Sequence, residues 1–139
     1  MNNLKFIIAL LFVTSVAFSQ NSDSKTVTVQ IDNIKNAKGQ LVVGLYSNPE
    51  SFLKTPSKGE IVKIKGSSAT VVFKNVTSGT YAVSLFHDEN SNEKLDTNFM
   101  GIPKESFASS NNAKGFMGPP KWEDAKFEVK DNFTVKIKF

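Results

Sequence analysis

The sequence predicts an all-β protein that folds as a single antiparallel β-sandwich of about seven short strands. Apolar and polar residues alternate with a period of two through most of the chain, as in strands with one buried face. Clusters of glycine, asparagine and aspartate separate most of these runs. The 139 residues suffice for one domain with a hydrophobic core and are too few for two ordinary domains.

Seven runs show this alternation, and they are the expected strands: 26–31, 41–45, 61–64, 69–73, 81–86, 127–129 and 133–139. A turn signal that ends in Gly39 separates the first two runs. Gly66-Ser67-Ser68 lies between the third and fourth runs and predicts a hairpin. Asp131-Asn132 marks a turn before the last run. Strands of this number and spacing are typical of immunoglobulin- or prealbumin-like sandwiches.

Two segments depart from the alternation. The segment 48–54 has an N-cap residue, Asn48, followed by Pro49, which predicts a helix of one or two turns. The segment 97–121 lacks sustained periodicity but carries several large apolar residues. Connections of this length are usually functional or disordered. We expect this long irregular loop to lie across an open end or face of the sandwich, as a packed cover or as a ligand-binding element.

The first 19 residues have the composition of a signal peptide that is cleaved before Gln20. The apolar run 6–13 is followed by Ala17-Phe18-Ser19, which supplies small residues for cleavage. Because this run is shorter than the roughly 20 residues of a membrane span, an uncleaved anchor is the lesser alternative, and the mature chain has no expected transmembrane segment. We therefore expect an exported protein, periplasmic or secreted, with a flexible N-terminus at 20–24 and one domain at 25–139.

The composition excludes several classes of function. The chain has no cysteine, so disulfides, thiol catalysis and thiolate metal sites are excluded. Its formal net charge is +4, but every basic residue is a lysine and the lysines are scattered singly. Proteins that read nucleic acid rely on the bidentate arginine fork, so no nucleic-acid partner is expected.

The segment 87–98 suggests a cation-binding loop. Asp88, Asn90 and Asn92 occupy alternate positions, and Asp96 follows. Their spacing matches positions one, three, five and nine of a calcium loop, with the backbone carbonyl of Lys94 at position seven. These five residues are the predicted ligands, and Ca²⁺ is the predicted ion.

Two departures weaken this calcium prediction. Glu93 stands where the template has a glycine, and Phe99 replaces the bidentate glutamate at position twelve. The entering element also reads as a strand instead of a helix. The alternative is a turn in which the Asp and Asn side chains bond to their own backbone. We therefore expect either weak calcium binding or a purely structural turn at 88–98.

The remaining chemistry favours a binding role over catalysis. His87 is the single histidine, at a strand end where a packed or hydrogen-bonded role is usual, and no G-x-S-x-G motif accompanies it. A hydrolase would need His87 exposed beside a serine, so we expect no enzyme activity. Trp122 and Phe116 are candidate residues for binding a sugar ring or a peptide. The alternative for Trp122 is packing on the core.

Five segments of the chain carry a recognisable pattern, namely 78–90, 94–98, 101–105, 110–112 and 118–127. This pattern closely resembles a bacterial family of uncharacterised proteins, DUF2141, and the resemblance extends from about Val27 to the C-terminus. It implies an exported β-sandwich with no established activity, and the signal sequence looks like those of the Bacteroidota. The family pattern has Asn-Gly-Lys where this chain has Asn92-Glu93-Lys94, which further weakens tight cation binding.

Two functions follow as expectations. The first is an exported, non-catalytic β-sandwich with a weak calcium loop at 88–98. The second is a carbohydrate- or peptide-binding surface module that uses Trp122 and the aromatic residues of the long loop. The expected partner is a polysaccharide or a protein of the cell envelope.

Overall fold

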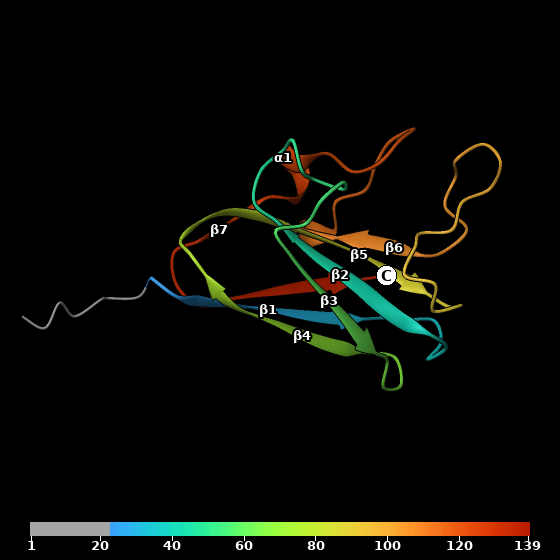
Figure 1. Cartoon of the computed structure of the whole chain (residues 1–139), viewed down its shortest axis with the longest axis horizontal. Helices are drawn as coiled ribbons and strands as arrows, with labels where there is room; N and C mark the ends of the chain where they lie inside the picture. The colour runs from blue at the N-terminus through green and yellow to red at the C-terminus, as the bar shows by residue number, and fades with distance from the viewer. Residues whose placement is uncertain (1–22) are drawn as a thin grey trace, which may run out of the picture.

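The computed structural model describes residues 23–139, which form two β-sheets packed face to face (Figure 1). One sheet has the order β4-β1-β8 and the other the order β3-β2-β5-β6, with β7 also pairing with β5. The strands are β1 (Lys25–Asp32), β2 (Gln40–Tyr46), β3 (Lys58–Lys63), β4 (Ala69–Val76), β5 (Gly79–Asp88), β6 (Phe107–Ser109), β7 (Phe127–Val129) and β8 (Phe133–Lys138). The predicted all-β sandwich is confirmed.

One strand pair is parallel, which departs from the antiparallel pairing expected throughout. β1 pairs antiparallel with β4, but it pairs parallel with β8, with Val27 opposite Phe133 and Ile31 opposite Ile137. The chain reaches β8 from β7, which belongs to the other sheet, so the turn at 131–132 crosses between the sheets. Asn132 anchors this crossing because its side-chain oxygen accepts a hydrogen bond from the Thr26 N–H at 2.9 Å.

The hairpin predicted around Gly66-Ser67-Ser68 is wrong, because β3 and β4 lie in different sheets. The turn itself exists, since Lys65 and Ser68 exchange main-chain hydrogen bonds of 3.4 Å. It carries the chain over one edge of the sandwich, and Ile64 at its start is buried in the core. The same alternation of apolar residues is compatible with a hairpin within one sheet and with a connection between two sheets. The local sequence pattern therefore does not distinguish the two.

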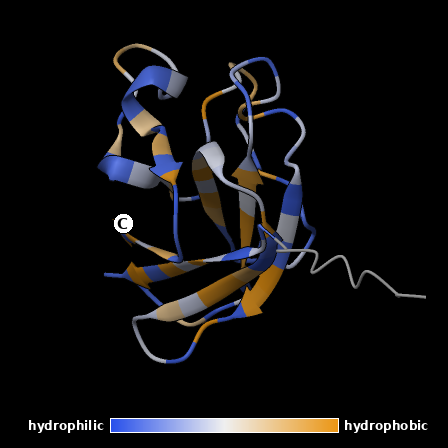
Figure 2. Ribbon diagram, turned by 90° about the vertical axis from the view of Figure 1, so that its left-hand side faces the viewer, coloured by the Kyte–Doolittle hydropathy of each residue, from blue (hydrophilic) through white to orange (hydrophobic). Residues whose placement is uncertain are grey.

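The core fills the space between the two sheets. Val27, Val29 and Ile31 of β1 face Leu41 and the following inward residues of β2, as the alternation predicts. Figure 2 shows hydrophobic residues concentrated on the strands of both sheets. A second, smaller cluster lies beside the main core and consists of Tyr46, Phe52, Ala82 and Ala125, with Ala113 and Trp122 packed against it.

The predicted helix at 48–54 is wrong. Asn48 caps a hydrogen-bonded turn, because its side-chain oxygen accepts the Ser51 N–H at 2.8 Å, but Leu53 has a φ of 61° and ends any helical progression. The turn instead places Phe52 in the smaller cluster. The α-helix of the described chain is α1 (Trp122–Ala125), a single turn.

The long segment 97–121 is more regular than expected. It contains β6 and the 3₁₀ turn η1 (Ser110–Asn112), and it leads into α1. The predicted signal peptide lies outside the described residues, as does most of the predicted flexible segment 20–24. Asp23 is described, and it accepts a hydrogen bond from the Ser78 hydroxyl at 2.9 Å. Between residues 23 and 139, no helix is both long enough and apolar enough to cross a membrane.

Candidate functional site

The end of β5 carries two buried polar residues, His87 and Asp88. Because neighbouring side chains on a strand point to opposite faces, the two do not contact each other in an orienting pair. The His87 Nε2 atom lies 2.7 Å from the Lys38 carbonyl oxygen, and the ring packs near Phe139, with centroids 6.4 Å apart. No serine hydroxyl of residues 23–139 hydrogen-bonds to the His87 ring. His87 therefore occupies the packed, hydrogen-bonded position that its strand phase predicts.

Asp88 organises the loop that follows β5. Its carboxylate accepts hydrogen bonds from the Gln40 side chain at 2.9 Å, the Asn92 N–H at 3.0 Å and the Glu93 N–H at 2.8 Å. Burial acts to raise the pKa of Asp88, but hydrogen bonds from Gln40 and from the N–H groups of Glu93, Asn92 and Ser91 outweigh burial and lower the pKa. The ionised carboxylate is thus the acceptor that closes the turn.

Asp96 plays the same role at the other end of the loop. Its carboxylate accepts hydrogen bonds from the side-chain amides of Asn90 at 2.6 Å and Asn92 at 3.0 Å. The Asn92 side-chain oxygen in turn accepts the Lys94 N–H at 3.0 Å. Asn90 and Asn92 therefore direct their amide nitrogens, which are donors, at Asp96.

Glu105 ties the two ends of the loop together, and sequence inspection missed it. Its carboxylate accepts the Glu89 N–H at 3.2 Å and the Asp96 N–H at 3.0 Å. The sequence offers only a lone carboxylate after Gly101-Ile-Pro103, with no spacing that links it to the loop. This partner depends on the chain turning back on itself.

The arrangement matches the alternative of a hydrogen-bonded turn. The predicted ligand residues lie in one loop, but their side chains are engaged with main-chain and amide N–H groups. Glu93 has a φ of 62°, so it stands in the left-handed conformation for which a glycine is suited. Within residues 23–139, no group of three or more histidine, aspartate or glutamate residues is placed to hold a metal ion. Calcium binding here would require these hydrogen bonds to rearrange, and it stays a prediction.

The two predicted ligand-binding aromatics are placed very differently. Trp122 is partly buried and packs edge-on against Phe52, with ring centroids 5.7 Å apart, and Phe52 packs in the same way on Tyr46. This contact favours the packing role for Trp122. Phe116, in contrast, is 92% exposed.

A groove of about 440 Å³ opens on the side of the sandwich where β6 and β8 meet. This volume lies within the range typical of ligand pockets. The groove is lined by β6 and the two residues before it, by the end of η1 and residues after it, and by the last two residues of the chain. The lining residues are Glu105, Ser106, Phe107, Ala108, Ser109, Asn112, Ala113, Lys114, Gly115, Gly118, Lys138 and Phe139.

β6 has an unpaired outer main-chain edge, which is exposed at Phe107 but buried at Ser109. The His87 N–H donates to the Ser106 carbonyl at 2.8 Å, so the main chain of Ser106 faces β5. Main-chain direction alternates along an antiparallel strand, so Ala108 also faces β5, whereas Phe107 and Ser109 direct their N–H and C=O groups away from it. In the described chain, no strand pairs with β6 on that outer side.

β6 also lacks the charges that other edge strands carry. The edge strands β3, β4, β7 and β8 contain charged residues, namely Lys58, Glu60, Lys63, Lys74, Glu128, Lys136 and Lys138. Charges of this kind discourage another strand from pairing with an edge. Among the strands of residues 23–139, β6 (Phe-Ala-Ser) is the edge strand without a charged residue.

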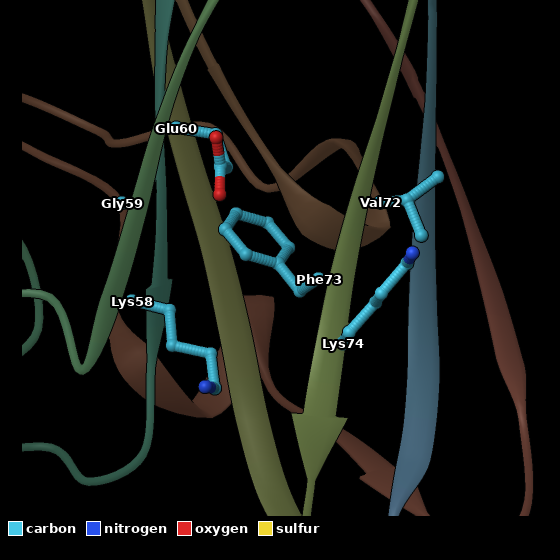
Figure 3. A pocket seen from close by; sticks show the side chains of 6 residues that line it. All are labelled: Lys58, Gly59, Glu60, Val72, Phe73 and Lys74. Carbon is cyan, nitrogen blue, oxygen red and sulfur yellow. The ribbon is translucent and has the colours of Figure 1, made fainter.

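The opposite side of the sandwich illustrates such a protected edge. A groove of about 490 Å³ lies between β3 and β4 (Figure 3). Figure 3 shows the Phe73 ring between the strands, with Lys58 and Glu60 projecting from β3 and Lys74 from β4. These charges make this groove polar and poorly suited to an extended apolar chain.

Comparison with known proteins places the chain in a family. The model of the DUF2141 family, described as "Uncharacterized protein conserved in bacteria", matches residues 29–137. Neither the curated proteins nor the solved structures contain a match to this chain. The match spans nearly the whole described domain, including the loop after β5 and the segment that carries β6. The chain therefore belongs to the DUF2141 family of uncharacterised bacterial proteins.

Proposed function

We propose that this chain is an exported, non-catalytic peptide-binding domain that takes an extended segment of a partner protein in the groove at β6, against the exposed residue Phe107. The observation that carries the proposal is the uncharged edge of β6 beside the groove of about 440 Å³. An extended peptide gains main-chain hydrogen bonds when it adds to such an edge, and side-chain pockets next to the edge supply selectivity.

The groove lining favours a peptide with alternating apolar and acidic residues. Phe107 and Phe139 offer aromatic surface at the groove, and Phe107 is 44% exposed. Lys114 and Lys138 line the same groove and are exposed, so they suit acidic side chains. Successive side chains of an extended peptide point to opposite faces, so its apolar residues can face the aromatic rings while its acidic residues face the lysines.

The geometry gives less support to a carbohydrate-binding module or a hydrolase. A sugar ring needs an open aromatic face, and Trp122 uses its surface against Phe52. A hydrolase needs an accessible base, and His87 is buried against the Lys38 carbonyl. Both observations favour a peptide-binding domain over a carbohydrate-binding or catalytic one.

Selection from a displayed library of random peptides tests this function. We expect enriched peptides to be extended, with apolar residues alternating with acidic ones. The variant Phe107→Lys places a charge on the β6 edge and should weaken binding of these peptides about tenfold, or about 1.4 kcal/mol. Val72→Lys is a matched control because Val72 on β4 is equally exposed, at 44%.

Binding is measured by titration calorimetry, with circular dichroism to show that both variants fold. Val72→Lys should bind the peptides like the wild type. If no peptide is enriched, or if Phe107→Lys binds as tightly as Val72→Lys, the proposed function is wrong.

A further inference from the structure

Five large apolar side chains project from two turns of the long segment, separate from the groove lining. Phe99 is 97% exposed, Phe116 is 92% exposed and Met117 is 95% exposed, and Met100 and Ile102 are also mostly exposed. We call residues 98–103 and 115–118 the two tips. Figure 1 shows both loops extending beyond the sheets on the same side of the molecule. Exposed apolar clusters of this kind mark interaction sites.

The first tip is held in a defined shape by Asn98. The Asn98 side-chain oxygen accepts the Met100 N–H at 2.9 Å and the Ile102 N–H at 3.0 Å. The Asn98 N–H also donates to the Ile102 carbonyl at 2.8 Å. These bonds close a turn whose apex is Phe99 and Met100, so the turn itself directs the apolar side chains outward.

The second tip is equally constrained. Gly115 approaches the Gly118 carbonyl so closely that a side chain at position 115 would collide with it. Met117 has a φ of 55°, the left-handed conformation that completes the tight turn. Phe116 and Met117 therefore form an apex that no other part of residues 23–139 covers.

Lysines flank both apexes. Lys104 follows the first tip, and Lys114 and Lys121 lie on either side of the second, all three exposed. Exposed apolar residues with lysines next to them suit an anionic lipid surface. The apolar side chains enter the membrane interface, and the lysine ammonium groups contact the headgroup phosphates. Two separate convex tips match the fluid headgroup layer better than they match a continuous protein face.

We propose that the two tips dock this protein onto an anionic lipid surface, with Phe99, Phe116 and Met117 inserted among the headgroups. The inserted side chains do not line the groove at β6, but Lys114 both lines that groove and flanks the second tip. The strength of the docking depends on salt, because the lysine contribution is electrostatic.

Sedimentation with vesicles tests this docking. The chain from Gln20 to Phe139 is mixed with vesicles of pure phosphatidylcholine, or of equimolar phosphatidylcholine and phosphatidylglycerol. We expect binding to the anionic vesicles and weaker binding at high salt. The triple variant Phe99→Ser/Phe116→Ser/Met117→Ser should lower the bound fraction at least about tenfold. The control Ile61→Ser/Val72→Ser removes exposed apolar residues of β3 and β4 and should bind like the wild type.

The fluorescence of Trp122, the single tryptophan, checks that each variant keeps its fold. Unchanged vesicle binding by the folded triple variant would overturn the proposal. A wild-type chain that stays in the supernatant with both kinds of vesicle would overturn it as well.

Discussion

Asp88 is a buried carboxylate that holds the loop after β5 in place. It has no cationic partner among its hydrogen-bond donors, which are the Gln40 amide and the main-chain N–H groups of Asn92 and Glu93. A carboxylate that accepts several N–H groups is stabilised in its ionised form. The loop conformation therefore depends on one negative charge.

Asp88→Asn should destabilise the fold by about 1.5–3 kcal/mol, because an amide nitrogen replaces one acceptor oxygen and meets main-chain N–H groups. The measurement is urea unfolding near neutral pH. Asp131→Asn, in the exposed turn before β8, should change stability little and serves as the control. Equal losses in the two variants would contradict the role of Asp88.

Acid should reduce the contribution of Asp88 to the stability of the fold. The pKa of Asp88 is lowered from its ordinary value of 3.8, so its ionised form favours the native state. The contribution of Asp88 to stability is fully present above pH 3.8 and is lost as the pH falls below that value through the native pKa. The free energy of unfolding of Asp88→Asn should therefore depend less on pH in this range, as pH-dependent urea unfolding will measure.

The calcium prediction for 88–98 is tested by thermal unfolding in calcium and in chelator. Calcium at 100 times its dissociation constant should add about 2.7 kcal/mol, and Asp96→Asn should remove this gain. The control variant Asp131→Asn should be stabilised by calcium as much as the wild type. Equal melting temperatures of the wild type in both buffers would leave the loop as a hydrogen-bonded turn alone.

At the scale of elements, β5 is longer than either strand that pairs with its outer edge. β7 pairs with the first residues of β5, from Gly79 to Tyr81, and β6 pairs with Ser84 to Phe86 of β5. Ser110 fills the gap between them. Its hydroxyl accepts the Val83 N–H at 2.9 Å and also contacts the Ala125 carbonyl oxygen. The Ser110 side chain thus replaces a main-chain hydrogen bond that a neighbouring strand would otherwise make to β5.

Ser110→Ala should cost about 1–3 kcal/mol, because it leaves the Val83 N–H buried without a partner. Ser109→Ala is a close control, since Ser109 is also buried but makes only a 3.5 Å contact to Ser84. Hydrogen exchange of the Val83 amide, together with urea unfolding, measures the effect. Similar behaviour of the two variants would contradict the bridging role of Ser110.

The sequence predicted these elements unevenly. β1, β2, β5 and β8 follow from alternation because each buries one complete face. β6 was missed because three residues are too few to show a period. The segment 48–54 carries local helix signals, but burial of Phe52 favours a turn over a helix there.

At the scale of the whole molecule, the first and last described strands are neighbours. β8 pairs parallel with β1 and contributes Val135 and Ile137 to the core. The sheet β4-β1-β8 therefore cannot be completed until the end of the chain has joined its beginning. Contacts of such long sequence separation are formed slowly in folding.

Ile137→Ala should cost about 2–5 kcal/mol, because it leaves a cavity between the sheets. Lys136→Ala, one residue away on the solvent face of β8, should change stability little. Urea unfolding of both variants gives the comparison. A small loss for Ile137→Ala would mean that β8 is not part of the folded core.

By itself, the sequence determined the β-sandwich class, the family and the polar turn after β5. These features rest on alternation and on residues close together in the chain. Only the tertiary structure decided that β3 and β4 belong to different sheets, that β1 and β8 are parallel, and that β6 lies at the edge of its sheet. It also decided that Glu105 closes the loop and that Trp122 packs on Phe52. The physical reason is that strand pairing and long-range contacts depend on which segments meet in space, which local alternation does not encode.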